Sequence, residues 1–171
     1  MIKTTIAIIV LLGAGIIWLR AQWARSKNSS AANEIINDLK SGKYVIESYA
    51  ESLGIMISSK PFPAAFDPAS AKRKLQELTG KLVHEKFSIR YADMNEAGKG
   101  IVIAEAKSKD IIAGYGGNTE IDIHFPCWIY IDADREAGKL DFRSTFPENK
   151  DHHYLLEDLS AALSQQLMQP A

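Results

Sequence analysis

The sequence predicts an α+β protein with an N-terminal transmembrane helix, further helices, a roughly four-stranded antiparallel sheet and a C-terminal helix packed on it. Three patterns predict this: an uncharged apolar run near the start, period-two alternation beyond residue 86, and leucines at helical spacing near the end. A chain of 171 residues is long enough for one domain and an anchor. We therefore expect an anchor over residues 1–25, a polar tether over 26–33 and one head domain over 34–171.

The anchor prediction rests on residues 4–19, TTIAIIVLLGAGIIWL, which carry no charge and are bounded by Lys3 and Arg20. At a rise of about 1.5 Å per residue this run covers about 24 Å, whereas the hydrocarbon layer is roughly 30 Å thick. Flanking residues must therefore share the membrane depth. Trp18 and Trp23 stand where aromatic rings meet lipid headgroups, and the Arg20 side chain is long enough to reach the interface.

A cleaved signal peptide is the main alternative to a retained anchor, with residues 13–15, Gly-Ala-Gly, as the small residues at the cleavage site. A buried helix of a soluble protein fits less well, because the run is apolar on every face. The positive charges flanking the run are nearly balanced between its two ends. A short tail with one lysine before the run is typical of exported signal anchors, which favours a head outside the cytoplasm.

Three helices are expected before the sheet. Apolar residues over 35–39 form one helical face, a Ser-Gly pair at 41–42 interrupts it, and helical spacing resumes over 44–53. Residues 60–68, KPFPAAFDP, indicate a loop that ends in a helix start, because aspartate caps free N–H groups and proline suits the first turn. The expected buried face of the third helix is Leu75, Leu78, Leu82 and Val83.

The apolar period then changes to two, which is typical of strands with one buried face. The expected strands are residues 87–93, 101–106, 120–132 and 140–146. An Asn-Glu-Ala-Gly turn joins the first two as a hairpin, and Pro126 in the third requires an edge position or a bulge. A last helix over residues 151–168 should pack on the sheet. Its expected apolar face is Leu156, Leu159, Leu163 and Leu167.

Charge and cysteine content narrow the classes of partner. The first 33 residues hold four of the 20 basic residues and no acidic one, so the rest carries 16 basic and 21 acidic residues, a net charge of −5. Nucleic-acid binding rests on Lys and Arg contacts to phosphates, so we expect no nucleic-acid partner. Cys127 is the single cysteine, which rules out an intrachain disulfide.

No catalytic, cofactor or metal site is predicted. Asp132, Asp134 and Glu136 are spaced faintly like a calcium loop, but the glycine and glutamate of an EF-hand are missing, so a solvated hairpin turn is expected. His124 and Cys127 are three apart on a strand and point to opposite faces, so they do not share a metal ion. Alternation buries Cys127 among isoleucines. If the chain were an enzyme, Asp132, Asp134 and His124 would be the first residues to substitute.

Residues 114–118 form a glycine-rich connection in which Tyr115 is a candidate partner contact, because loops often carry binding function. Trp128 and Tyr130 lie on the more polar side of the longest strand, where large aromatics are either covered or form a contact patch. The leading hypothesis is a single-pass, non-enzymatic accessory or subunit protein, held by membrane lipid and bound to a protein partner. A head with an apolar ligand or lipid pocket, and an inhibitor or immunity-type protein, are the alternatives.

Overall fold

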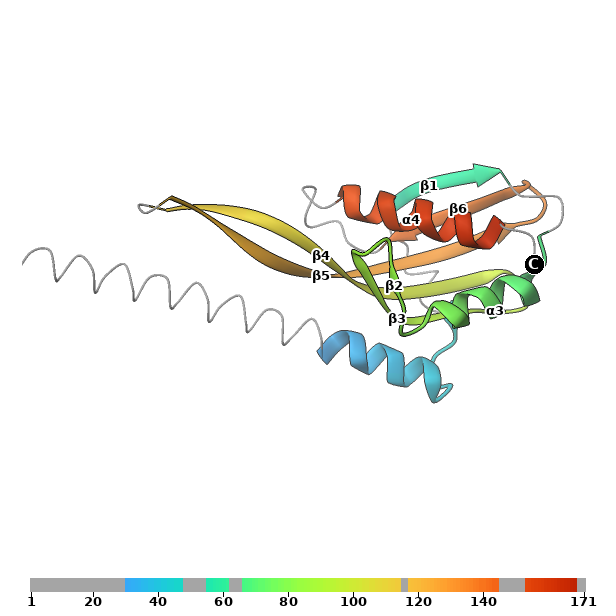
Figure 1. Cartoon of the computed structure of the whole chain (residues 1–171). Coiled ribbons are helices and arrows are strands. Elements are labelled where there is room, and N and C mark those ends of the chain that lie inside the picture. Colours follow the sequence, from blue (N-terminus) through green and yellow to red (C-terminus); the bar gives the residue numbers. More distant parts are fainter. Residues whose placement is uncertain (1–29, 48–54, 62–65, 115–116, 145–152, 169–171) are drawn as a thin grey trace, which may run out of the picture. The chain divides into compact units, whose positions relative to one another are not determined.

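The computed structural model describes residues 30–47, 55–61, 66–114, 117–144 and 153–168. The chain divides into two compact units, Met1–Asn37 and Asp38–Ala171. The second unit contains a six-stranded antiparallel sheet in the order β1-β6-β5-β4-β3-β2, together with helices α3 and α4 (Figure 1). The prediction of a mixed α+β protein with an antiparallel sheet is confirmed.

Five of the six strands follow one another as hairpins, from β2 to β6, and β1 pairs with β6 at the far edge. The elements are β1 Ile55–Pro61, α3 Pro68–Leu78, β2 Leu82–Val83, β3 Phe87–Met94, β4 Lys99–Gly114, β5 Gly117–Asp134, β6 Lys139–Ser144 and α4 His153–Met168. Both predicted hairpins and the last helix are present. The strands β4 and β5 are longer than their alternation alone predicted.

Helix α3 begins as expected. The Asp67 carboxylate accepts hydrogen bonds from the N–H groups of Ala69 and Ser70, at 3.3 and 2.9 Å, and Pro68 occupies the first turn. The expected end was wrong, because α3 stops at Leu78. Gly80 has a φ of +82°, a conformation that glycine adopts without a Cβ penalty and that ends the helix. Leu82 and Val83 therefore form strand β2 and do not belong to the helix face.

The main core lies between one face of the sheet and the helices α3 and α4 (Figure 1). Its side chains alternate along four strands as period-two burial requires, and they include Phe87, Ile89, Val102, Ala104, Cys127, Ile129, Leu140 and Phe142. The predicted face of the last helix is confirmed, because Leu156, Leu159, Leu163 and Leu167 are all buried. A hydrogen bond of 2.9 Å between the hydroxyls of Ser58 and Ser160 joins β1 to α4.

The prediction of about four strands was too low. It missed β2, which has two residues, and β1, which is a mostly exposed edge strand. Residues 60 and 61 were assigned to a loop, but Lys60 and Pro61 pair with Leu140 and Lys139 on β6. An edge strand buries little side-chain surface, so neither alternation nor apolar content marks it strongly. Its partner lies about 80 residues away in the sequence, which no local pattern reveals.

The chain before β1 is helical over residues 30–40, turns at Gly42 with a φ of +71°, and is helical again at residues 46 and 47. The expected break at the Ser-Gly pair is therefore present, and the helix includes residues 30–33 of the expected tether. No helix within the described ranges is long and apolar enough to cross a membrane. Residues 4–19, and with them Trp18, Arg20 and Trp23, lie outside the described residues.

Gly98 closes the turn between β3 and β4 against the end of β5. Its N–H donates to the Asn95 carbonyl at 3.1 Å, and its carbonyl accepts from the Ala133 N–H at 3.0 Å. The φ of Gly98 is +82°, and a Cβ added there would lie 2.9 Å from the Cβ of Ala133. This position therefore requires glycine for both its backbone conformation and its contact with β5.

Gly98→Ala should destabilise the head more than Gly138→Ala, a matched control. Gly138 also has a positive φ, +63°, but an added Cβ would have nothing within 4 Å. The control should cost about 1–2 kcal/mol of unfolding free energy for the left-handed conformation. Gly98→Ala should add about 1–3 kcal/mol for overpacking against Ala133. Urea unfolding followed by circular dichroism measures both, and equal losses would contradict the close contact.

Candidate docking site

The most distinctive feature of the second unit is a two-stranded extension of the sheet. β4 and β5 are joined by sixteen register pairs, from Lys99↔Asp132 to Gly114↔Gly117. Strand β3 pairs with β4 only as far as Ala106, and β6 pairs with β5 only from Tyr130 onward. The last seven pairs, residues 108–114 with 117–123, therefore extend past both neighbouring strands (Figure 1). We call these residues the hairpin arm, which is about 20 Å long at the usual strand rise.

The arm is an unusual arrangement because a two-stranded ribbon is at best marginally stable by itself in water. The rest of the ladder fixes its root, but no described strand pairs with either of its edges. In the sequence, isoleucines stand at 111, 112, 121 and 123. A protein that keeps such a ribbon outside its sheet presents backbone donors and acceptors to a partner.

The two edges of the β4–β5 ladder differ at the root of the arm, where Pro126 stands on the β5 side. Lys107 donates its N–H to the Lys86 carbonyl at 2.8 Å, so the backbone groups of Lys107 and Glu105 point toward β3. Pro126 is paired with Glu105, so its nitrogen points away from β4. No described strand lies there, because β6 reaches only to Tyr130. The predicted edge position of Pro126 is confirmed. Because proline has no N–H, this edge is a weaker site for the addition of another strand.

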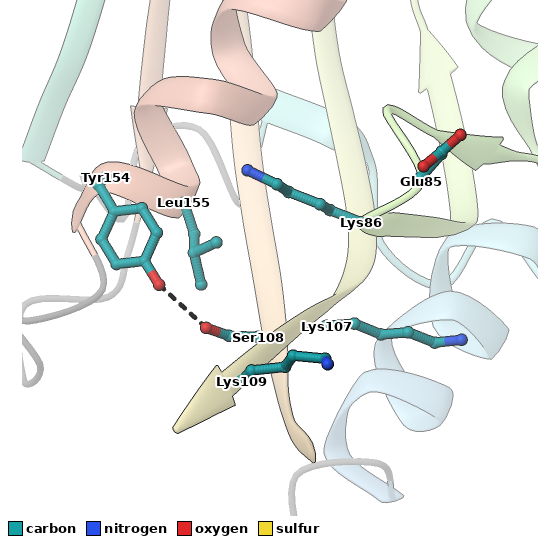
Figure 2. A pocket seen from close by; sticks show the side chains of 7 residues that line it. All are labelled: Glu85, Lys86, Lys107, Ser108, Lys109, Tyr154 and Leu155. Carbon is teal, nitrogen blue, oxygen red and sulfur yellow. Dashed lines mark hydrogen bonds between the residues drawn. The ribbon is translucent and has the colours of Figure 1, made fainter. Parts of the chain in front are cut away.

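The β4 edge begins at a surface pocket of about 410 Å³, which we call the notch (Figure 2). It is lined by Glu85, Lys86, Lys107, Ser108, Lys109, Tyr154 and Leu155. Three consecutive residues of one strand line it although their side chains alternate between faces. Such a lining is expected of a pocket at the strand's edge, beside the backbone. The notch therefore marks the point where β3 stops covering β4.

Polar contacts hold the walls of the notch. The hydroxyls of Ser108 and Tyr154 lie 3.0 Å apart, and Lys107 and Lys109 extend away from them (Figure 2). The ammonium of Lys86 pairs with the Asp158 carboxylate on α4 at 3.2 Å. Three of the four charged lining residues are lysines, in a head whose net charge is negative. Because Lys86 is already paired with Asp158 and Glu85 is acidic, the basic character of the notch rests on Lys107 and Lys109 of β4.

The turn that forms one wall of the notch is strained. His84 and Glu85 both have positive φ values, 48° and 57°, and the Lys86 N–H donates to the Val83 carbonyl at 3.2 Å. Two central residues with positive φ make a type I′ turn, which normally uses Asn and Gly. A residue with a Cβ costs about 1–2 kcal/mol in this conformation. The side chain of Glu85 is thus kept beside the notch at a cost in stability.

The structure describes two of the three residues that the sequence nominated as partner contacts. Tyr130 is 4% exposed and Trp128 is half-buried, and both lie on the sheet face opposite α3 and α4. Their register partners on that face, Ile101 and Ile103, are fully buried. Alternation left open whether these aromatic side chains are covered or form a contact patch. The Tyr130 side chain is covered. Tyr115 belongs to the two residues at the tip of the arm, outside the described residues.

The acidic residues around the β5–β6 turn are engaged in structural contacts. The Asp134 carboxylate accepts from the N–H groups of Glu136 and Ala137 at 3.0 and 2.9 Å, which closes the turn. Asp132 pairs with Lys99 at 2.5 Å, and Asp141 accepts from the Ser59 hydroxyl at 2.6 Å. Within the described residues, no group of three or more metal-ligating side chains converges. The Asp134 contacts are those of the expected hairpin turn.

His124 and Cys127 lie on opposite faces of β5, as alternation predicted. Nδ1 of His124 is 2.8 Å from a carboxylate oxygen of Glu105 on the neighbouring strand, at the root of the arm. Cys127 is 3% exposed and belongs to the main core. Burial raises the pKa of the Cys127 thiol to about 12.

No protein-family model, no curated protein and no solved structure matches this chain. The function must therefore be argued from the geometry itself. Sequence reasoning placed a partner contact at the glycine-rich connection but missed the arm's edges and the notch. The available signal was on the β5 side alone, where alternation over residues 120–132 exceeds the usual strand length.

The raised pKa of Cys127 predicts an unreactive thiol in the folded protein. At about pH 8 the native thiol should react with Ellman's reagent at least about 100-fold more slowly than in urea, because the thiolate is the nucleophile. The same shift predicts that unfolding free energy is unaffected below pH 9 and decreases as pH rises from 9 toward 12. Rapid reaction of the native protein at pH 8 would contradict the burial of Cys127.

Proposed function

We propose that this chain is a single-pass, membrane-anchored and non-enzymatic accessory or subunit protein, whose head docks on a protein partner through the hairpin arm. One observation carries the docking part: seven register pairs of β4 and β5 extend beyond β3 and β6. A ribbon of this kind gains stability when a partner covers it, so the presence of the hairpin arm favours a role in assembly.

The anchoring part rests on the uncharged run of residues 4–19 and the tryptophans at 18 and 23. A head held next to the bilayer meets membrane-bound partners at high effective concentration, so modest contacts suffice for assembly. The run's lysine-bearing N-terminal flank favours an exported head in the envelope. Two reporters fused after Ala171, each active on only one side of the membrane, decide the orientation of the head.

The two alternatives that the sequence also allows gain less from the geometry. A lipid- or ligand-handling head needs an apolar pocket. Four of the seven residues that line the notch of Figure 2 are charged, although the stems of their side chains are apolar, and large core residues such as Phe87, Phe142 and Leu159 are fully buried. An inhibitor with an acidic docking surface would not place three lysines at the root of the arm that docks.

The proposal predicts that shortening the arm removes the complex and spares the head. The variant replaces residues 109–122 with Asn-Gly, so that a two-residue turn joins Ser108 to Ile123. These two residues form a register pair of the same hydrogen-bonding type as the native pair Gly114↔Gly117. Full-length protein tagged after Ala171 should pellet with membranes. In mild detergent it should migrate on a native gel as a complex heavier than the chain, and the shortened variant should migrate alone.

Tyr115→Asn is the matched control, because it changes the tip and keeps all sixteen register pairs. The Tyr115→Asn variant should retain the complex if the partner binds the edges of the arm. It should lose the complex if the partner binds the tip. The urea midpoint of the shortened variant must match that of the parent chain, so that loss of the complex is not loss of the fold. A shortened variant that still forms the complex, or a parent chain that leaves the membrane fraction, would contradict the proposal.

A further inference from the structure

We propose that the β4 edge of the arm receives an extended acidic segment of the partner, which adds to the sheet as a strand in line with β3 and ends at the notch. This inference rests on the proposed docking role and names the chemistry of the partner. The observations that carry it are the backbone phase of β4, the place of the notch and the lysines around it.

The backbone phase shows which groups the edge presents. The Lys107 N–H points toward β3 and bonds to the Lys86 carbonyl at 2.8 Å. Backbone groups of an antiparallel strand alternate sides, so those of Ile111 and Ala113 point to the same side as those of Lys107. Strand β3 reaches only to Ala106 on that side. An added strand would take up the ladder where β3 leaves it.

The choice of edge follows from Pro126. On the β5 side the outward position at 126 lacks an N–H, and a proline on an edge is a common safeguard against strand addition. From Lys107 to Gly114 the β4 side contains no proline. The β5 edge thus lacks a donor at the root of the arm, whereas the β4 edge continues open from the end of β3. The open edge is also the one that begins at a pocket.

The notch fits the end of an added strand. Its lining takes Lys107, Ser108 and Lys109 from the edge itself and Tyr154 and Leu155 from the start of α4. The side chains of Lys107 and Lys109 are exposed, and extend to the side of β4 away from Tyr154 (Figure 2). An acidic side chain of an added strand that faces this side would lie beside them. Opposite charges on neighbouring strands contribute roughly 0.2–1 kcal/mol per pair.

A designed peptide pair tests the inference on the full-length chain in non-ionic detergent. The probes are acetylated, amidated octapeptides of alternating Glu and Val, or of alternating Lys and Val, labelled for fluorescence anisotropy. The acidic peptide should bind at least about tenfold more tightly than the basic one, and added salt should weaken its binding. Lys107→Glu should weaken acidic-peptide binding about fivefold or more.

Ile111→Pro tests strand addition itself. It removes an N–H that points to the open edge and leaves the donors of the β4–β5 ladder in place, so the arm should persist. It should weaken acidic-peptide binding at least about tenfold, whereas Ile111→Thr, which keeps the N–H, should change it less than about twofold. Amide exchange at Ile111 and Ala113 should slow when the peptide binds to the parent chain.

Equal binding of the two peptides, or equal binding to the Pro and Thr variants, would overturn the inference. Complete displacement of the acidic peptide by inorganic phosphate would also overturn it, because that result describes an anion site without strand addition. These outcomes are separable from the test of the proposed function. A complex that needs the arm while neither peptide binds rejects only the strand-addition inference. Peptide binding with a complex that persists without the arm rejects only the docking role.

Discussion

The β4–β5 ladder is the interaction on which the rest of the structure depends. Its first part is sandwiched between β3 and β6 and carries Val102, Ala104, Cys127 and Ile129 into the main core. Its second part continues with the same register but without neighbours among the described strands. One continuous set of backbone hydrogen bonds therefore joins a well-packed core to a ribbon whose edges pair with no other described strand. The core supplies the stability, and the ribbon supplies an exposed edge.

Period-two alternation predicted the hairpins correctly, because half-buried strands expose their pattern locally. Phe87 and Ile89 each lie between polar neighbours and are almost completely buried. The same reasoning failed where tertiary structure decides. Residues 55–61 form a strand only because β6 offers an edge, and Leu82 left the helix because Gly80 redirects the chain.

The candidate site was only partly predictable, because its parts meet through pairing. The lysines of the notch come from 86, 107 and 109, and Tyr154 comes from a helix that starts about 45 residues later. No spacing rule connects them. Alternation showed correctly that Cys127 is a core residue, and it left Tyr130 open between cover and contact. The part of β4 that lacks a neighbour on the β3 side is set by where β3 ends. The spacing of apolar residues in helices and strands does not encode that end.

The difference between the two parts of one ladder is the central claim, and amide hydrogen exchange along β4 and β5 in the isolated full-length protein tests it most directly. Protection should be high at residues such as Val102 and Ile129 and should fall by about 100-fold or more beyond Lys107 and His124, because no described strand pairs with the edges of the ribbon. Uniform protection from Lys99 to Gly114 would contradict the account, since it would mean that the arm is already covered in the free protein.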